Sequence, residues 1–173
     1  MENKIIVLAY VGTGKTEMTK RYEGLWNPSS DDYRYVWDKD ISHEQRKGAL
    51  NRVENLNFPN NFIDAIFEKV ENNIVLLSLT EKLFQLYESE EFKSKMKGAR
   101  MILACPTRDS FDDYIKRYRA RGNSEAFIEN RQREFPYIMD KFENAQGYEK
   151  VVVDRYLDEA LIKFGIVLHK KHA

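Results

Sequence analysis

Short apolar runs along the chain alternate with longer segments whose apolar residues have helical spacing. The first run, residues 4–8, is apolar and β-branched, as expected of a strand that is buried on both faces. Similar runs predict strands at residues 33–37, 73–79, 100–105 and 149–153. Strands that alternate with helices in this way predict an α/β fold, a three-layer sandwich with a five-stranded, mainly parallel sheet.

Helices are predicted in the segments between these runs. The first is expected over about residues 14–22, and Ser42 is a suitable N-cap for a polar helix over about 44–56. An apolar stripe predicts a helix over 62–70, and Thr80 can cap the helix after the third strand.

The second half of the chain is expected to be mostly helical. Residues 88–98 are charged and are expected to be exposed. A long helical region is predicted over 110–143, with a break near Gly122 and a kink or an end at Pro136. Residues 157–163 predict the last helix, and the basic end of the chain is expected to fray.

Composition indicates a single soluble domain over residues 1–173. The 28 basic residues balance 28 acidic ones, so no overall field favours nucleic acid or an anionic membrane. The one cysteine, Cys105, lies in an apolar run and fits a core thiol in a reducing compartment. No signal peptide is expected, and no apolar segment approaches the ~20 residues of a membrane span. We therefore expect a cytoplasmic protein without a membrane partner.

Residues 9–16, AYVGTGKT, have the spacing of a phosphate-binding loop between a strand and a helix. Gly12 and Gly14 allow the backbone to wrap around phosphate oxygens, because glycine reaches positive φ at little cost. Lys15 can reach the β- and γ-phosphates, and the Thr16 hydroxyl can bind Mg²⁺. Ala9 stands where the usual motif has its first glycine, which is tolerable if φ there stays negative. The alternative is an ordinary glycine-containing turn between a strand and a helix.

This loop and its flanks, residues 4–18, resemble those of P-loop NTPases. The resemblance implies a nucleotide site formed by consecutive residues of the loop and of the start of the helix. These residues are Val11, Gly12, Thr13, Gly14, Lys15, Thr16 and Glu17.

Residues directly after the strands are candidates for chemistry, because ligands of open α/β sheets bind beyond the carboxyl ends of the strands. Asp38 and Asp40 follow the predicted second strand, where a carboxylate can bind Mg²⁺ or accept a proton. The alternative for both is a structural role at the start of a helix, where aspartate is common at the cap and in the first turn. We favour Asp38 as the functional residue. After the third strand, Ser78 stands where many NTPases have an aspartate.

A basic helix is predicted after the fourth strand. Arg117 and Arg121 are one turn apart, so they can clamp a polyphosphate or a transferring phosphoryl group. The alternative is a solvated face paired with Asp112, Asp113 and Glu125.

A P-loop protein with this helical pair resembles the nucleoside monophosphate kinase group, which includes adenylate, shikimate and gluconate kinase relatives. The resemblance implies an acceptor-side helical region over about 38–72 and a lid-like helical region over about 108–143. It also implies catalytic roles for Lys15, Asp38, Arg117 and Arg121, with Arg108 a weaker nucleotide-binding candidate. Arg155 lies where related kinases place the adenine-contacting loop, although it could equally be a surface residue.

The leading hypothesis is a phosphotransferase that uses ATP, or another NTP, to phosphorylate a small molecule such as a nucleotide or nucleoside. Mg²⁺ would be held by Thr16 and Asp38. An alternative is a nucleotide-binding regulatory or interaction protein with weak or no NTPase activity, which the missing carboxylate at Ser78 favours. Nucleic-acid binding through residues 116–121 is a third reading, and the zero net charge argues against it.

Overall fold

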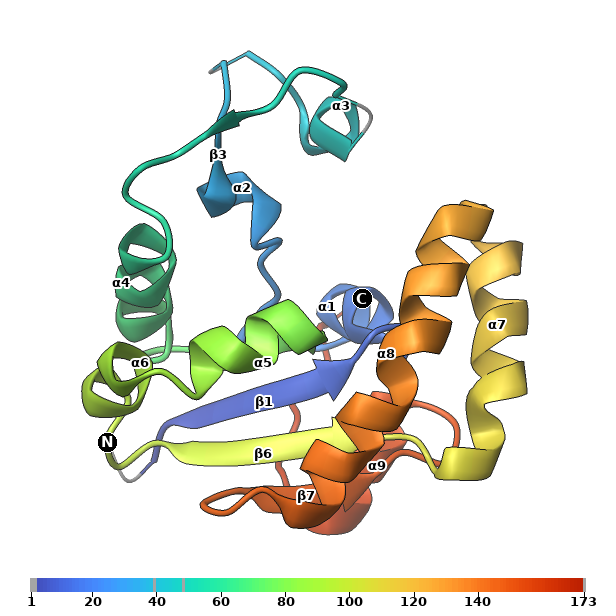
Figure 1. Cartoon of the computed structure of the whole chain (residues 1–173). Helices are drawn as coiled ribbons and strands as arrows, with labels where there is room; N and C mark the ends of the chain where they lie inside the picture. Colours follow the sequence, from blue (N-terminus) through green and yellow to red (C-terminus); the bar gives the residue numbers. More distant parts are fainter. Residues whose placement is uncertain (1–2, 39, 48, 173) are drawn as a thin grey trace.

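A parallel β-sheet forms the centre of the molecule (Figure 1). The computed structural model describes residues 3–38, 40–47 and 49–172. The sheet has five strands in the order β2-β5-β1-β6-β7, and each pair of neighbours is parallel. Its strands are β1 (Ile5–Tyr10), β2 (Leu25–Trp26), β5 (Ile74–Leu79), β6 (Arg100–Cys105) and β7 (Glu149–Val152). The predicted α/β fold is confirmed.

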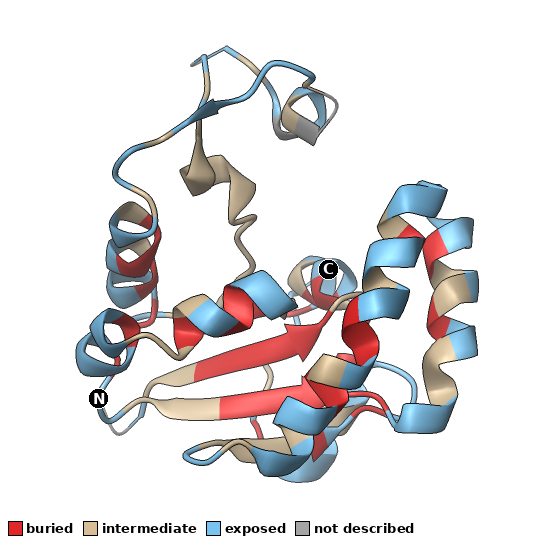
Figure 2. Cartoon of the chain, viewed as in Figure 1, coloured by how far each residue is buried: buried red, intermediate tan, exposed pale blue. Residues whose placement is uncertain are grey.

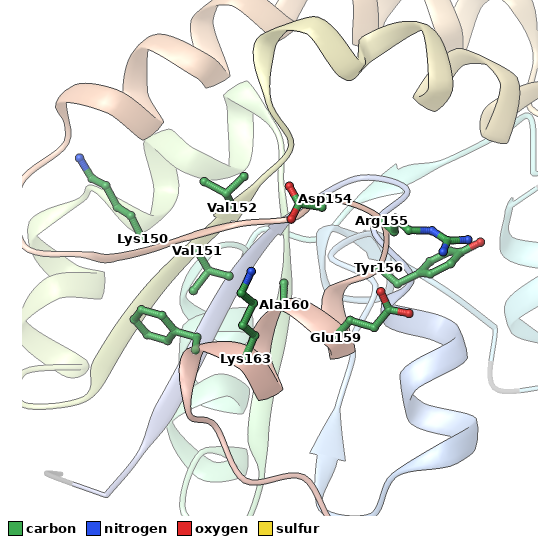
Figure 3. Close-up of a pocket in the computed structure, with 10 residues that line it drawn as sticks. Lys150, Val151, Val152, Asp154, Arg155, Tyr156, Glu159, Ala160 and Lys163 are labelled. Atoms are coloured by element: carbon green, nitrogen blue, oxygen red, sulfur yellow. The ribbon is translucent and has the colours of Figure 1, made fainter.

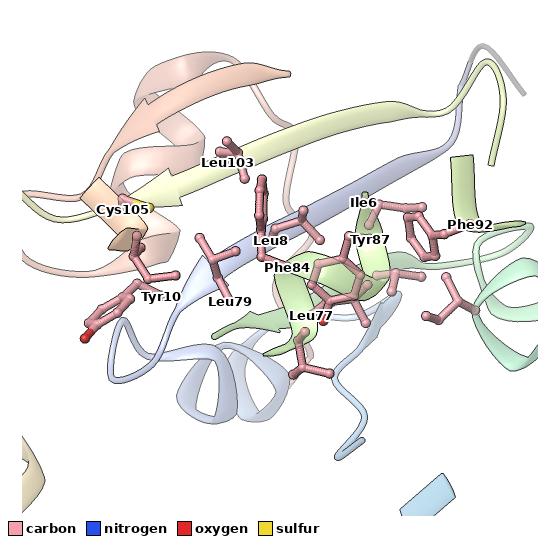
Figure 4. Packing of buried hydrophobic residues seen from close by; sticks show 14 of the residues in the cluster. Ile6, Leu8, Tyr10, Leu77, Leu79, Phe84, Tyr87, Phe92, Leu103 and Cys105 are labelled. Atoms are coloured by element: carbon pink, nitrogen blue, oxygen red, sulfur yellow. The ribbon is translucent and has the colours of Figure 1, made fainter. Parts of the chain in front are cut away.

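Helices cover both faces of the sheet, and the middle strands are buried along most of their length (Figure 2). Successive side chains of β1 alternate between two cores, with Ile6, Leu8 and Tyr10 on one face and Val7 and Ala9 on the other. The first core also holds Phe84, Tyr87 and Phe92 from helices over that face (Figure 4). Helices on this side are α4 (Asn60–Lys69), α5 (Glu81–Tyr87), α6 (Glu90–Lys95), α7 (Phe111–Ala120) and α8 (Glu125–Asn144). The opposite core includes residues of α1 (Lys15–Arg21) and α9 (Leu157–Phe164).

The second strand of the sheet is not the predicted one. The edge strand is β2, only two residues long, and it pairs with β5 through Leu25 and Trp26. Part of predicted strand 33–37 is helical, in α2 (Asp31–Arg34), and Tyr35–Val36 forms β3. Strand β3 pairs antiparallel with β4 (Val53–Glu54), in a separate two-stranded sheet. The aromatic residue of β3, Tyr35, packs against Arg52, whose guanidinium lies 5.1 Å from the centre of the ring.

The described residues of 31–57, hereafter the arm, lie apart from the main sheet in the upper part of Figure 1. The helix predicted there over 44–56 is shorter than expected, since α3 (His43–Lys47) is followed by β4. Ser42 is its N-cap as predicted, accepting a hydrogen bond from the Gln45 N–H at 3.2 Å.

Three further expectations need correction. Residues 88–98 contain α6, whose Phe92 is buried in the core. Helix α8 does not end at Pro136, one of the two outcomes predicted there, but continues to Asn144. The basic end of the chain is tied to the end of α1, where the Lys171 N–H donates to Arg21 O. The break before α8, the Thr80 cap and the last helix agree with the predictions. None of the helices in the described part of the chain has the length and apolar character needed to cross a membrane.

Candidate nucleotide site

The loop between β1 and α1 has the backbone expected of a phosphate-binding loop. Gly12 and Gly14 have φ of +93° and +104°, in the left-handed region that favours glycine. No described residue other than glycine has positive φ, so Ala9 fits its position in the strand. The Thr13 hydroxyl donates to Tyr10 O at 2.9 Å, and the Leu157 N–H donates to Thr13 O at 2.9 Å. The loop is therefore held from both of its sides before any ligand arrives.

Lys15 is folded back over this loop. Its side chain is buried, and its Nζ donates to Ala9 O at 3.4 Å. Burial, and to a smaller extent the nearby charge of Arg121, together lower the pKa of Lys15 from 10.5 to about 8. Two cations therefore face the same loop, an arrangement that an anion between them would stabilise.

Helix α7 packs directly on the loop. The Tyr118 hydroxyl donates to Val11 O at 2.7 Å, and a Cβ placed on Gly12 would lie 2.9 Å from the Tyr118 ring. Arg117 donates to Gly12 O at 2.9 Å and to Arg155 O at 2.7 Å. Its guanidinium lies over the rings of Tyr114 and Tyr156, at 4.5 and 5.1 Å. Arg117 thus joins the phosphate loop to the loop after β7.

Arg121 is less tightly held than Arg117. Its guanidinium lies 5.6 Å from the centre of the Tyr118 ring, and its Nη2 donates to Asn123 Oδ1 at 3.2 Å. It is exposed, with one side toward Lys15. The predicted pair of arginines therefore separates into one that binds backbone carbonyl oxygens and one that remains accessible.

The loop after β7 borders a cavity of about 420 Å³ between β7 and α9 (Figure 3). Arg155 and Tyr156 line one end, and the Arg155 guanidinium lies 5.9 Å from the centre of the Tyr156 ring. Tyr156 also lies 3.8 Å from the position of a Cβ on Gly14. Arg117 connects the backbone of Arg155 to Gly12 of the phosphate loop, and the predicted nucleotide contact of Arg155 stays a prediction.

Arg108 and Asp38 lie elsewhere. Arg108 forms ion pairs with Asp140 and Glu143 of α8, at 2.6 and 2.8 Å, which raise its pKa. Asp38 is exposed and follows β3 in the arm, rather than a strand of the main sheet. Asp40 is exposed as well.

A second cavity, of about 340 Å³, lies between α4 and the α5–α6 pair. Two cations line it, Arg34 and Lys82, and the Arg34 guanidinium lies 5.1 Å from the centre of the Phe58 ring. Glu91 is the carboxylate in its lining. Sequence reasoning missed Arg34 and Lys82, because Arg34 lies in a segment predicted as a strand.

The residues present fit a nucleotide with its metal ion. Thr16 is exposed at the start of α1, directly after the buried Lys15. Among the described residues, no three His, Cys, Asp or Glu side chains come close enough together to hold a metal ion. A Mg²⁺ ion would therefore be held mainly by the phosphates, water and the Thr16 hydroxyl.

No family model matches the chain, and no curated protein matches it by sequence. Solved structures do share its fold. The tunicamycin resistance protein of Deinococcus radiodurans aligns with a TM-score of 0.52 and 12% identity, over 96% of this chain and 99% of that one. A gluconokinase from Sinorhizobium meliloti 1021 aligns with a TM-score of 0.48 and 11% identity, over 94% and 89%. The chain therefore shares its overall fold, built around a five-stranded parallel sheet, with the tunicamycin resistance protein.

Proposed function

We propose that this protein is a phosphotransferase that uses ATP, or another NTP, and Mg²⁺ to phosphorylate a small-molecule acceptor. The observation that carries this proposal is the loop at Gly12–Lys15, in which a buried lysine and Arg121 face the same anion-binding backbone. The P-loop kinase fold supports phosphoryl transfer in general.

The proposed donor site assigns a role to each part of the loop. Residues 11–17 bind the phosphates, with Lys15 on the β- and γ-phosphates and the Thr16 hydroxyl on Mg²⁺. Mg²⁺ neutralises phosphate charge when bound. The nucleoside extends toward Arg155 and Tyr156, whose ring is partly exposed. Arg121 covers the transferring phosphoryl group, and Arg117 keeps Gly12 and the loop after β7 in place.

The proposed acceptor site is the cavity lined by Arg34 and Lys82. Its two cations favour an acceptor that carries an anionic group, and Phe58 and Leu86 provide apolar surface for a ring or carbon chain. A nucleotide satisfies both requirements. The cavity is lined in part by residues 58–63, inside the acceptor-side region that the sequence predicted.

The test is a screen of nucleosides, nucleotides and small phosphorylated or hydroxylated compounds for acceptor-dependent ADP release from MgATP. Calorimetry with ATP measures binding separately. Arg121→Ala should lower turnover on the order of 100-fold, because a contact to the transferring phosphoryl group is worth ~3 kcal/mol. Arg119→Ala is the control, since Arg119 is exposed on the same helix and faces Glu125. Failure of wild type to bind any nucleotide would refute the proposal.

A nucleotide-binding regulatory protein is the second candidate. Ser78 supports it, because β5 provides no carboxylate at the position where many NTPases have one. This candidate predicts that ATP binds normally while no acceptor in the screen increases ADP release.

A further inference from the structure

A buried ion pair on α8 lies at the carboxyl end of β5. It is formed by Arg131 and Glu134 of α8, with Arg131 Nη1 3.0 Å from Glu134 Oε1. Only 15% and 7% of the two side chains are exposed. Neither residue is among those that line the two cavities described above.

Glu134 reaches the carboxyl end of β5. Its Oε2 accepts a hydrogen bond from the backbone N–H of Glu81 at 3.1 Å, two residues after the last residue of β5. Glu81 precedes Lys82, which lines the second cavity. Glu134 therefore provides a carboxylate at the strand end where Ser78 lacks one.

The same carboxylate is close to the phosphate loop. Phe135, the next residue, packs against the ring of Tyr10 with centroids 5.7 Å apart. The charge of Glu134 raises the pKa of Tyr10, and the charge of Arg131 lowers it. Tyr10 is the second residue of the loop motif, so Glu134 is near the phosphate loop as well as at the end of β5.

The pair is incompletely satisfied. In the described part of the chain, Arg131 Nε and Glu134 Oε1 are buried without a geometrically suitable hydrogen-bond partner. Buried polar atoms that only hold two helices together are normally hydrogen-bonded. A ligand hydroxyl beside Glu134 Oε1 would satisfy this atom.

We infer that Glu134 is the general base of the proposed reaction, positioned by Arg131 and by the Glu81 N–H. The inference rests on the proposed function. The acceptor O–H bond breaks and its proton passes to Glu134 as the acceptor oxygen bonds to the γ-phosphorus. The bond from the γ-phosphorus to the β,γ-bridging oxygen breaks, and its electron pair leaves with the nucleoside diphosphate. The proton returns to water after product release.

The charged groups around Glu134 fit this role. Burial raises the pKa of Glu134, and the Glu81 carboxylate acts in the same direction. Arg131 and the Glu81 N–H lower it, and the Tyr10 hydroxyl is the titratable group that faces it from the phosphate loop. The carboxylate is therefore a stronger base than an exposed one, and Arg131 keeps it ionised.

The first experiment measures ADP formation from MgATP with the acceptor panel, together with ATP binding. Glu134→Gln keeps the side-chain size and the acceptor for Glu81 N–H, so ADP formation should fall on the order of 100-fold or more while ATP affinity stays unchanged. Glu129→Gln, on an exposed position of α8, should match wild type. Wild-type turnover in Glu134→Gln would overturn the inference alone. Wild type that binds ATP but forms no ADP would overturn the proposed function together with the inference.

The second experiment is a pH profile, which tests the role of Glu134 even if the Glu134→Gln variant does not fold. Wild-type kcat/KM should fall on the acid side with a pKa above the ordinary glutamate value. Arg131→Gln removes the charge that lowers the pKa of Glu134, so this acid limb should move to higher pH. An ion pair that only docks α8 would leave the limb unmoved, and that result would refute the role of Glu134.

Discussion

Raising the pH through the pKa of Lys15 perturbs the proposed site without any mutation. Burial and Arg121 lower this pKa from 10.5 to about 8, so the charged form is disfavoured by about 3 kcal/mol before an anion binds. Between these pH values the unfolded chain binds more protons than the folded chain does. The free energy of unfolding should therefore rise with pH from about 8 to 10.5, and Lys15→Met should abolish that rise.

Nucleotide binding should show the opposite sign. Phosphates favour the ammonium form, so above about pH 8 binding requires Lys15 to take up a proton. ATP affinity should then fall about tenfold for each further pH unit. Calorimetry at pH 9, in buffers with different ionisation enthalpies, measures the number of protons taken up when ATP binds. Lys15→Met corrects for titration of the nucleotide itself.

Arg121→Gln tests how far the charge of Arg121 lowers the pKa of Lys15. Removal of its charge should raise the pKa of Lys15, so the loss of ATP affinity should begin at a higher pH than in wild type. Arg119→Gln, an exposed substitution on the same helix, should leave the profile unchanged. Equal proton uptake in wild type and Lys15→Met would refute the assignment of Lys15 to the phosphate site.

Substitutions at three other positions test the phosphate loop, its contact with α7 and the arm. Arg117→Ala should weaken ATP binding as well as turnover, since hydrogen bonds from a charged group are worth about 1.5–3 kcal/mol. Arg117→Lys should restore little, because lysine lacks the planar fork of the guanidinium. Unchanged ATP affinity of Arg117→Ala by calorimetry would contradict this prediction. Gly12→Ala should destabilise the fold by about 1–3 kcal/mol, because φ is positive there and the new Cβ would lie 2.9 Å from the Tyr118 ring. Denaturant unfolding measures this change. Wild-type stability would contradict the packing of α7 on the loop. Asp38→Asn should reduce turnover more than ATP binding; loss of stability alone, with unchanged specific activity, would point to a capping role.

The parts of the fold that could be predicted are those with long apolar runs. Strands β1, β5 and β6 are each six residues long and covered on both faces, so their composition alone identifies them. The edge strand could not be found, because β2 has two residues and is followed by Asn27 and Pro28. A strand of this length has no periodicity to detect, whereas the aromatic residues of 33–37 have the composition of one.

The missed edge strand also explains the position of Asp38. The reasoning from sequence was that a carboxylate after the second strand lies near the phosphate loop. The strand to which this rule applies is β2, which is followed by residues 27–30 and then by α2. Asp38 was counted from the wrong strand, so its place in the arm follows from that one error in assignment. Its catalytic role remains a prediction.

The basic helix shows why residue spacing could not assign the arginines. Spacing of four residues put Arg117 and Arg121 on one face, and both do lie toward the phosphate loop. Spacing contains no information on which carbonyl oxygens that face will meet. The positive φ of Gly12 brings its backbone against Tyr118, and this close approach places Gly12 O within reach of Arg117. The packing of Tyr118 on Gly12 thus decides which arginine is held by the backbone and which remains accessible beside Lys15.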